Sequence, residues 1–328
     1  MMPNIAVTGV GAVIGHGVVK SIRHSSDLKN SRIIGIDCNP DSAGFMYCDR
    51  HYVGNMVSSP GYIDELLDIC KKEAVDVFIP LIEEEFLMVH DNIPRFSEMG
   101  TRVILQPRRI LEMFMDKYFT AMALKDAGIP TPETLLFAPE NLSVIFDMAE
   151  RHGFPLLAKP RRGRSSKGQV FINSEQQIVM YMDILKGQPY VIQEFLSEES
   201  EEYTCGVFKT PGMSEPYSIA LKRKLLNGMT ISAEVVFDDS LSGVCKDVAC
   251  LFPVDGSLNV QVRKKNGVPH VFEINPRYSS TSYIRAMCGF NDVEMGIQYI
   301  LNHCAIEKPI IEKLKVIRYS EERCVSYS

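Results

Sequence analysis

The first hundred residues alternate short apolar runs with segments of helical spacing, and this alternation limits the fold more than any other feature. The apolar runs occupy residues 4–8, 32–36, 75–80 and 102–105, and helical spacing falls at 16–23 and 62–73. Strands that alternate with helices pair in parallel, because each crossover returns the chain to the same end of the sheet. The sequence therefore predicts an α/β domain with a doubly wound parallel sheet over residues 1–105.

The pattern changes after residue 105. Helical spacing over 110–127 ends at Gly128, Pro130 and Pro132. Strands are predicted at 154–159, 169–172 and 190–195, and residues 202–273 are mostly extended. Turns are predicted at residues 227–228, 255–256 and 266–267, and the last two predict hairpins. This part predicts an α+β fold with an antiparallel sheet.

Composition narrows the class of protein. The 328 residues include 35 Lys+Arg and 41 Asp+Glu, so the formal charge is −6 and gives no basic face for nucleic acid. No run approaches the length of a transmembrane helix, and no signal peptide is recognised. The nine cysteines contain no C-x-x-C pair, which indicates reduced thiols rather than zinc ligands. We expect a cytoplasmic protein that acts on small molecules, with no nucleic-acid or membrane partner. A homodimer is expected only because dimers are the most common oligomers of proteins.

A glycine-rich turn follows the first predicted strand. Gly9, Gly11 and Gly15 come close to the dinucleotide-binding fingerprint, and Asp37 ends the next strand, where an acid would bind a ribose. The third glycine is one residue late, and glycine also permits a tight turn with close packing. We favour the packing interpretation; a nicotinamide-dependent oxidoreductase is the alternative.

A second turn, rich in glycine, serine and basic residues, follows the predicted strand that ends at Lys159. Gly163, Ser165, Ser166 and Gly168 can close over a polyphosphate, with backbone N–H groups, hydroxyls and cations as ligands. We expect a mobile lid over residues 161–168, because like charges repel until an anion neutralises them. An exposed basic turn is the alternative.

Two further strands carry candidate ligands. Glu194 and Leu196 lie where a hinge strand could meet an adenine, although a simple core strand would look similar. In the last predicted hairpin, Glu273 and Asn275 share one face, and Gln261 on the partner strand can face them. Three such oxygen ligands suit Mg²⁺. Arg277 lies just beyond, where a cation could meet a phosphoryl group in transfer.

In this order the motifs resemble the ATP-grasp superfamily, and most of all a single synthetase unit of the carbamoyl-phosphate synthase large subunit. The resemblance implies a pre-ATP-grasp α/β domain at residues 1–105, an ATP-grasp domain at 106–305 with a lid subdomain at about 118–192, and a C-terminal segment at 306–328. It implies a ligase that uses ATP and one or two Mg²⁺ ions, for which Mn²⁺ can substitute. ATP would phosphorylate a carboxylate, and an amine or a similar nucleophile would attack the acyl phosphate. A non-catalytic nucleotide-binding protein is a further alternative.

The resemblance also implies a role for each motif residue. Lys117 and Lys159 would contact the nucleotide phosphates, and the loop 163–168 would cover them. Glu194 and Leu196 would bind adenine, and either Glu202 or Glu201 would bind the ribose. Gln261, Glu273 and Asn275 would be the metal ligands, with Arg277 as the catalytic residue near the acyl phosphate. Residues 222–232 have no clear counterpart in the synthase and are a candidate substrate loop.

Overall fold

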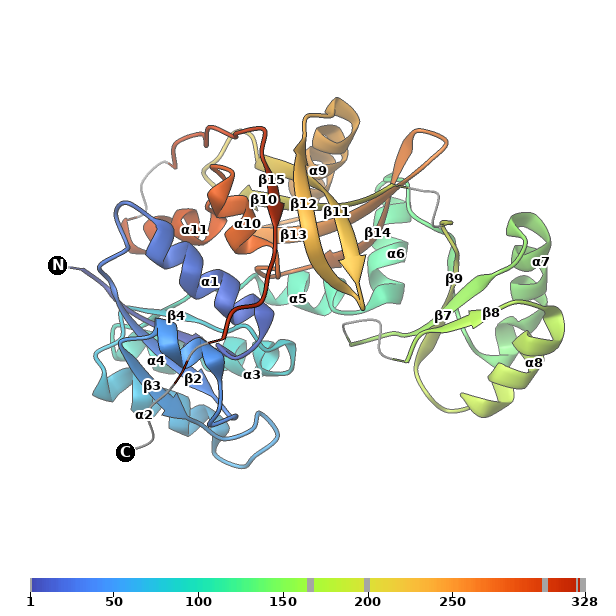
Figure 1. Ribbon diagram of the computed structural model, residues 1–328. Helices are drawn as coiled ribbons and strands as arrows, with labels where there is room; N and C mark the ends of the chain where they lie inside the picture. Colours follow the sequence, from blue (N-terminus) through green and yellow to red (C-terminus); the bar gives the residue numbers. More distant parts are fainter. Residues whose placement is uncertain (1, 164–167, 198–200, 303–305, 323, 325–328) are drawn as a thin grey trace.

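The computed structural model describes residues 2–163, 168–197, 201–302, 306–322 and 324, and it contains three β-sheets (Figure 1). A parallel sheet comes first along the chain, a small antiparallel sheet lies at the far end of the molecule, and a large antiparallel sheet lies between them. The predicted α/β domain followed by an α+β fold is confirmed. Among the described helices, none is long and apolar enough to cross a membrane. All eight cysteines in these ranges are free thiols.

The N-terminal sheet has five parallel strands in the order β3-β2-β1-β4-β5. Its strands are β1 Asn4–Thr8, β2 Arg32–Asp37, β3 Arg50–Val53, β4 Val77–Ile79 and β5 Arg102–Val103. Its helices are α1 Val13–His24, α2 Tyr62–Lys72, α3 Phe86–Asp91 and α4 Ile93–Glu98, with 3₁₀ turns η1 Ala43–Tyr47 and η2 Glu83–Glu85. The predicted strands correspond to β1, β2, β4 and β5, whereas β3 was not predicted, because this edge strand is largely exposed and polar.

The glycines after β1 serve close packing. A Cβ atom on Gly15 would lie 2.3 Å from the carbonyl oxygen of Gly9, and one on Gly44 would lie 1.9 Å from that of Val10. Both distances are far below van der Waals contact, so α1 and η1 can approach this turn only where no side chain is present. The packing interpretation of the turn therefore has a direct steric basis.

The predicted single helix at 110–127 is wrong. The chain forms two helices, α5 Arg108–Phe114 and α6 Lys117–Asp126. Asp116 stands between them as the N-cap of α6, where its carboxylate accepts the backbone N–H groups of Tyr118 at 3.0 Å and Phe119 at 3.3 Å. This cap stabilises the start of a new helix and ends the previous one.

The small sheet is antiparallel, in the order β6-β9-β7-β8. Its elements are β6 Thr134–Leu136, η3 Pro139–Asn141, α7 Leu142–His152, β7 Leu156–Pro160, β8 Val170–Ile172, α8 Glu175–Ile184 and β9 Tyr190–Glu194. Both helices cover one face of this sheet (Figure 1) and share its apolar core, which includes Ile145, Ile178 and Ile192. The opposite face is left for the interior of the molecule.

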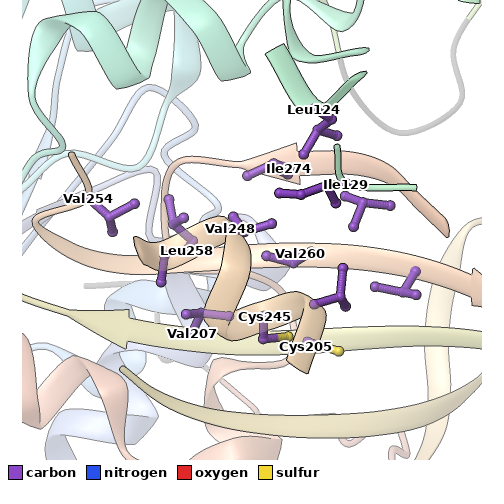
Figure 2. Packing of buried hydrophobic residues seen from close by; sticks show 14 of the residues in the cluster. Leu124, Ile129, Cys205, Val207, Cys245, Val248, Val254, Leu258, Val260 and Ile274 are labelled. Carbon is purple, nitrogen blue, oxygen red and sulfur yellow. The ribbon is translucent and has the colours of Figure 1, made fainter. Parts of the chain in front are cut away.

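The large sheet has six antiparallel strands in the order β14-β13-β10-β11-β12-β15. They are β10 Glu202–Lys209, β11 Tyr217–Leu226, β12 Met229–Val236, β13 Gly256–Lys265, β14 Val268–Asn275 and β15 Lys315–Ile317. The associated helices are α9 Asp239–Leu251, α10 Ser282–Met287 and α11 Asp292–Asn302. Figure 2 shows Val207 and Cys205 of β10 packed against Val248 and Cys245 of α9.

Three details of this sheet differ from expectation. The hairpin expected at residues 255–256 is wrong, because these residues join α9 to β13. Asn227 and Gly228, for which only a turn was predicted, form a hairpin between β11 and β12, and both have positive φ. The helix α9 interrupts a stretch expected to be mostly extended. Asp238 starts it by accepting the N–H groups of Ser240 and Leu241.

A fully buried ion pair joins α10 and α11 beneath the large sheet. Arg285 and Asp292 are both 0% exposed, with 3.4 Å between guanidinium and carboxylate. The arginine lies against Gly206 of β10, where a Cβ atom would come within 2.2 Å of its nitrogen Nη1. The bare backbone of one strand thus provides the space for the pair.

Candidate functional site

A cavity of about 510 Å³ lies among the three sheets. Its walls come from the start of α1, from β7 and β9 of the small sheet, and from β10 to β14 of the large one. Ten of the residues predicted for the site line this cavity: Lys117, Lys159, Gly163, Glu194, Leu196, Glu202, Gln261, Glu273, Asn275 and Arg277. Residues that are up to 160 positions apart in the sequence therefore meet in one cavity.

Lys159 is the most buried cation in the cavity wall. It lies on β7 at 5% exposure, and its ammonium stands 5.9 Å from the ring centroid of Phe272. Burial lowers the pKa of Lys159 to about 8, and the nearby carboxylate of Glu273 opposes this shift. No carboxylate within the described ranges lies in ion-pair distance of its ammonium. An anion brought to this point would restore the stability of the charged form.

The glycine-rich turn lies beside Lys159. Lys117, at the start of α6, donates a hydrogen bond to the carbonyl oxygen of Gly163 at 2.9 Å. Gly163 has φ +114° and faces open space, whereas Gly168 has φ +74°, is held by the hydroxyl of Tyr190 and does not line the cavity. Ser165 and Ser166, like the rest of 164–167, lie outside the described residues, so the lid stays a prediction.

Glu194 and Leu196 stand at the other end of β7 and β9. The Glu194 carboxylate is buried, pairs with Lys265, and accepts the backbone N–H of Glu133 at 3.2 Å. Leu157, Phe171 and Phe272 add apolar surface around it. The structure thus brings one polar strand end and an apolar wall together, which is the combination that a planar heterocycle requires.

The structure separates the two candidate ribose acids. Glu202 lines the cavity between Arg223 and Arg263, the latter at 2.6 Å. Burial would raise the pKa of Glu202, but these two guanidinium groups lower it below its ordinary value. Glu201 is exposed, pairs with Lys222 and does not line the cavity.

The three predicted metal ligands come from the hairpin of β13 and β14. Gln261 lies directly opposite Glu273 in the strand register, and Asn275 lies opposite Asn259, a cavity residue that the sequence analysis missed. Gln261 and Asn275 present side-chain oxygens that accept hydrogen bonds from arginines, at 2.6 and 3.1 Å. Glu273 forms no ion pair with any residue in the described part of the chain.

A carboxylate without a counterion beside two or three amide oxygens fits Mg²⁺, which takes oxygen ligands and keeps several waters. In the described ranges, no group of three or more His, Cys, Asp and Glu residues lies close enough together to hold a metal ion. The oxygens of this hairpin are therefore the best candidates for a metal site.

Arg277 is positioned by the N-terminal domain. Its guanidinium binds the carboxylate of Glu83 at 2.9 Å and the side-chain oxygen of Asn275 at 3.1 Å. Glu83 was not identified from the sequence, because it lies in a 3₁₀ turn with no motif, 194 residues away from its partner. The contact links the parallel sheet to the predicted metal site.

The candidate substrate loop at 222–232 is not a loop. Most of it belongs to β11 and β12, whose hairpin brings Arg223, Leu225 and Met229 to the cavity wall. The register shifts between Lys224 and Leu225, where β12 carries Ile231 as one extra residue. Contact between these residues and a substrate remains a prediction.

At the glycine-rich turn of residues 9–15, the carboxylate that would bind a ribose already accepts backbone hydrogen bonds. The carboxylate of Asp37 already accepts the backbone N–H groups of Gly11 at 2.7 Å and Asn39 at 2.9 Å. A carboxylate bound in this way stabilises the turn itself.

Two family models match this chain. Residues 5–104 match the PylC-like N-terminal domain, and residues 186–323 match a family described as ATP-grasp in the biosynthetic pathway with Ter operon. The carbamoyl phosphate synthase large chain of Methanosarcina barkeri is 21% identical over 286 residues, which cover 83% of this chain and 25% of that protein. The chain thus spans about a quarter of the length of this relative.

Solved structures share the fold. Carboxyaminoimidazole ribonucleotide synthase from Aspergillus clavatus, complexed with ATP, has a TM-score of 0.73 at 17% identity, over 95% of this chain and 80% of that one. The biotin carboxylase domain of 2-oxoglutarate carboxylase from Hydrogenobacter thermophilus, solved with MgADP and bicarbonate, has a TM-score of 0.72 at 14% identity, over 95% and 72%. These relatives do not support the oxidoreductase alternative. Two matching family models and the shared fold agree: the chain contains a PylC-like N-terminal domain and an ATP-grasp domain.

Proposed function

We propose that this protein is an ATP- and Mg²⁺-dependent ligase that joins a carboxylate to an amine or a similar nucleophile through an acyl phosphate. One observation carries the proposal. A buried lysine that has no counterion among the described residues lies in the same cavity as an oxygen-rich hairpin. An apolar strand end between two sheets provides a place for a base. Cations for phosphate, oxygens for a metal and a pocket for adenine are what phosphoryl transfer from ATP requires.

In the proposed reaction, a carboxylate oxygen of the substrate attacks the γ-phosphorus, and the bond to the bridging oxygen of ADP breaks. The amine nitrogen then attacks the acyl carbon, phosphate leaves with the acyl oxygen, and the nitrogen loses a proton. Lys117 and Lys159 would neutralise the phosphates, and Arg277 would stabilise charge on the transferred group. No nucleophilic side chain is needed, because the chemistry depends on position and charge.

The metal ligands in this proposal are Gln261, Glu273 and Asn275, with Asn259 beside them. These side chains would hold Mg²⁺, which would supply positive charge against the phosphates. Glu273 supplies the one carboxylate, and the two amides must release their arginine partners or share their oxygens with the metal. A second ion and Mn²⁺ as a substitute stay predictions.

The adenine and ribose contacts complete the assignment. Glu194 and Leu196 would bind the base, and Glu202, which lines the cavity, is favoured over Glu201 for the ribose. We also propose the division into residues 1–105, 106–305 with a lid at about 118–192, and 306–328. A cytoplasmic location and a homodimer remain predictions, as does the absence of nucleic-acid and membrane partners.

The test mixes the protein with ATP, Mg²⁺ and panels of carboxylic acids and amines, and measures ADP. Hydroxylamine in place of the amine should trap the acyl phosphate as a hydroxamate, and ¹⁸O should pass from the labelled carboxylate to phosphate. Lys159→Ala should abolish both signals, whereas Lys246→Ala, a change on the exposed face of α9, should leave them unchanged. ATP binding without ADP release across all acids would leave a non-catalytic nucleotide-binding protein and overturn the proposal.

A further inference from the structure

Six cations of the described residues line the cavity, and five of them have an evident partner or ligand. Arg223 and Arg263 pair with Glu202, and Arg277 pairs with Glu83. The two lysines, Lys117 and Lys159, have the phosphates of ATP as their proposed ligands. Arg318 is the sixth, and no carboxylate in the described ranges forms an ion pair with it.

The position of Arg318 is set by the C-terminal strand. β15 pairs with β12 at the edge of the large sheet, and the chain beyond it passes toward the N-terminal domain (Figure 1). The backbone N–H of Arg318 donates to the carbonyl oxygen of Ile231 at 2.8 Å. Its guanidinium donates to the carbonyl oxygens of Thr230 at 3.0 Å and Ser280 at 2.5 Å. Each guanidinium has five N–H donors, so donors remain for a ligand in the cavity.

The surroundings of Arg318 offer further donors but, among the described residues, no negative side chain that pairs with it. Ala12, Val13 and Ile14, at the start of the twelve-residue helix α1, line the same cavity. No side chain of the described part caps this helix and no acidic residue stands in its first turn, so its first N–H groups have no side-chain acceptor there. Burial lowers the pKa of Arg318, as expected for a partly buried cation without a compensating charge.

We propose that Arg318, together with the first turn of α1, binds a second anionic group, carboxylate or phosphate, on a substrate other than ATP. This group is separate from the carboxylate that is phosphorylated, because that carboxylate must reach the γ-phosphate beside Glu273 and Arg277. The inference rests on the proposed function and narrows it: the acid or the amine carries an additional negative charge. An arginine and a helix start are the groups that recognise such oxyanions.

The guanidinium also has a structural role, which the test must separate from ligand binding. Its two carbonyl contacts tie the β11–β12 hairpin to the loop before α10, so Arg318→Ala removes both the charge and these contacts. Arg318→Gln removes the charge and keeps two amide N–H donors on a shorter side chain. Arg318→Lys keeps the charge. Lys315→Ala, three residues earlier on β15, exposed and outside the cavity, is the matched control.

The experiment uses the full chain saturated with Mg²⁺ and AMP-PNP, so that the nucleotide phosphate site is already filled. Binding of inorganic phosphate, acetate and neutral acetamide is then measured by ligand-observed NMR titration. We expect saturable binding of at least one anion and none of acetamide. Arg318→Gln should weaken the anion by about tenfold or more, the loss expected for a charge-assisted contact. Arg318→Lys should recover part of this loss, and Lys315→Ala should match the wild type.

The two anions separate the two substrate chemistries. Tighter phosphate binding assigns a phosphate ester to the substrate, and tighter acetate binding assigns a second carboxylate. No saturable anion binding, or equal binding in Arg318→Gln, overturns the inference. Failure of the proposed function looks different: wild-type protein would then bind the anion but release no ADP with any acid.

Discussion

Replacement of Lys159 by methionine should make the protein more stable and its nucleotide binding weaker. Lys159 is 5% exposed, and burial lowers its pKa from 10.5 to about 8. At about 1.4 kcal/mol per pH unit, holding this charge in the free protein costs about 3 kcal/mol at pH 7. Lys159→Met keeps the aliphatic stem without the charge, so urea should unfold the variant at a higher midpoint. AMP-PNP should bind more weakly by about 1.5–3 kcal/mol, the range for hydrogen bonds between charged groups.

The pH dependence follows from the sign of this shift. The folded protein holds the Lys159 proton less tightly than the unfolded chain, so the penalty is full below pH 8 and fades between pH 8 and 10.5. The stability advantage of Lys159→Met should therefore disappear above about pH 10.5. Near pH 8, AMP-PNP binding should take up about half a proton in the wild type, because the bound phosphates favour the charged lysine. Calorimetry in buffers of different ionisation enthalpy measures this uptake.

Lys117 is the matched control for this reasoning. Its ammonium donates to the carbonyl oxygen of Gly163 in the glycine-rich turn beside Lys159, but Lys117 is only partly buried. Lys117→Met should therefore weaken AMP-PNP binding without stabilising the free protein. If Lys117→Met and Lys159→Met raised the free energy of unfolding equally, the stabilisation could not be assigned to the burial of the Lys159 charge. Unchanged AMP-PNP affinity in Lys159→Met would remove this lysine from the phosphate site.

Three further changes test other parts of the site. Glu273→Gln should abolish ATP consumption with the correct acid while circular dichroism stays unchanged, and near-normal turnover would exclude it as a metal ligand. Glu202→Gln leaves two guanidinium groups without their carboxylate and should lower the free energy of unfolding by about 3 kcal/mol or more, whereas Glu201→Gln, at the surface, should cost about 1 kcal/mol or less. Because the pKa of Glu202 is lowered, its contribution to folding stability should be present above the ordinary glutamate pKa and disappear as acid protonates the folded carboxylate. If acid destabilised Glu202→Gln as much as the wild type, this reasoning would be contradicted. NAD should show no saturable binding at micromolar concentration, and binding that is lost in Asp37→Ala would restore the oxidoreductase alternative.

The parts of the fold that could be predicted from sequence are those whose signal is local. Buried parallel strands are continuously apolar, so β1, β2 and β4 stand out, and alternate positions of one strand place Glu273 and Asn275 on one face. The edge strand β3 lacks this signal because most of it faces solvent. In α9, serine, glycine and valine weaken helix propensity, and only the Asp238 cap and the packing against the large sheet favour the helix.

The site residues that were missed depend on long-range contacts. Glu83 meets Arg277 across 194 residues, and Arg318 meets Thr230 across 88. Neither stands in a motif, because its position comes from the packing of whole domains and not from the neighbouring sequence. Glu202 shows a different limit of the sequence. The motif could not decide between two adjacent glutamates. Only the folded sheet, in which Glu202 lies opposite Arg263, places this one in the cavity wall.

The buried arginine beneath the large sheet has a consequence for how related sequences can diverge. Gly206 and Arg285 occupy the same volume, since any Cβ at position 206 would meet the guanidinium. A larger residue at 206 is compatible only with a smaller one at 285, and the loss of that arginine would leave Asp292 buried without a counterion. Among homologues these three positions should therefore change together or not at all, so that an alanine at 206 beside an intact arginine and aspartate should be a rare combination.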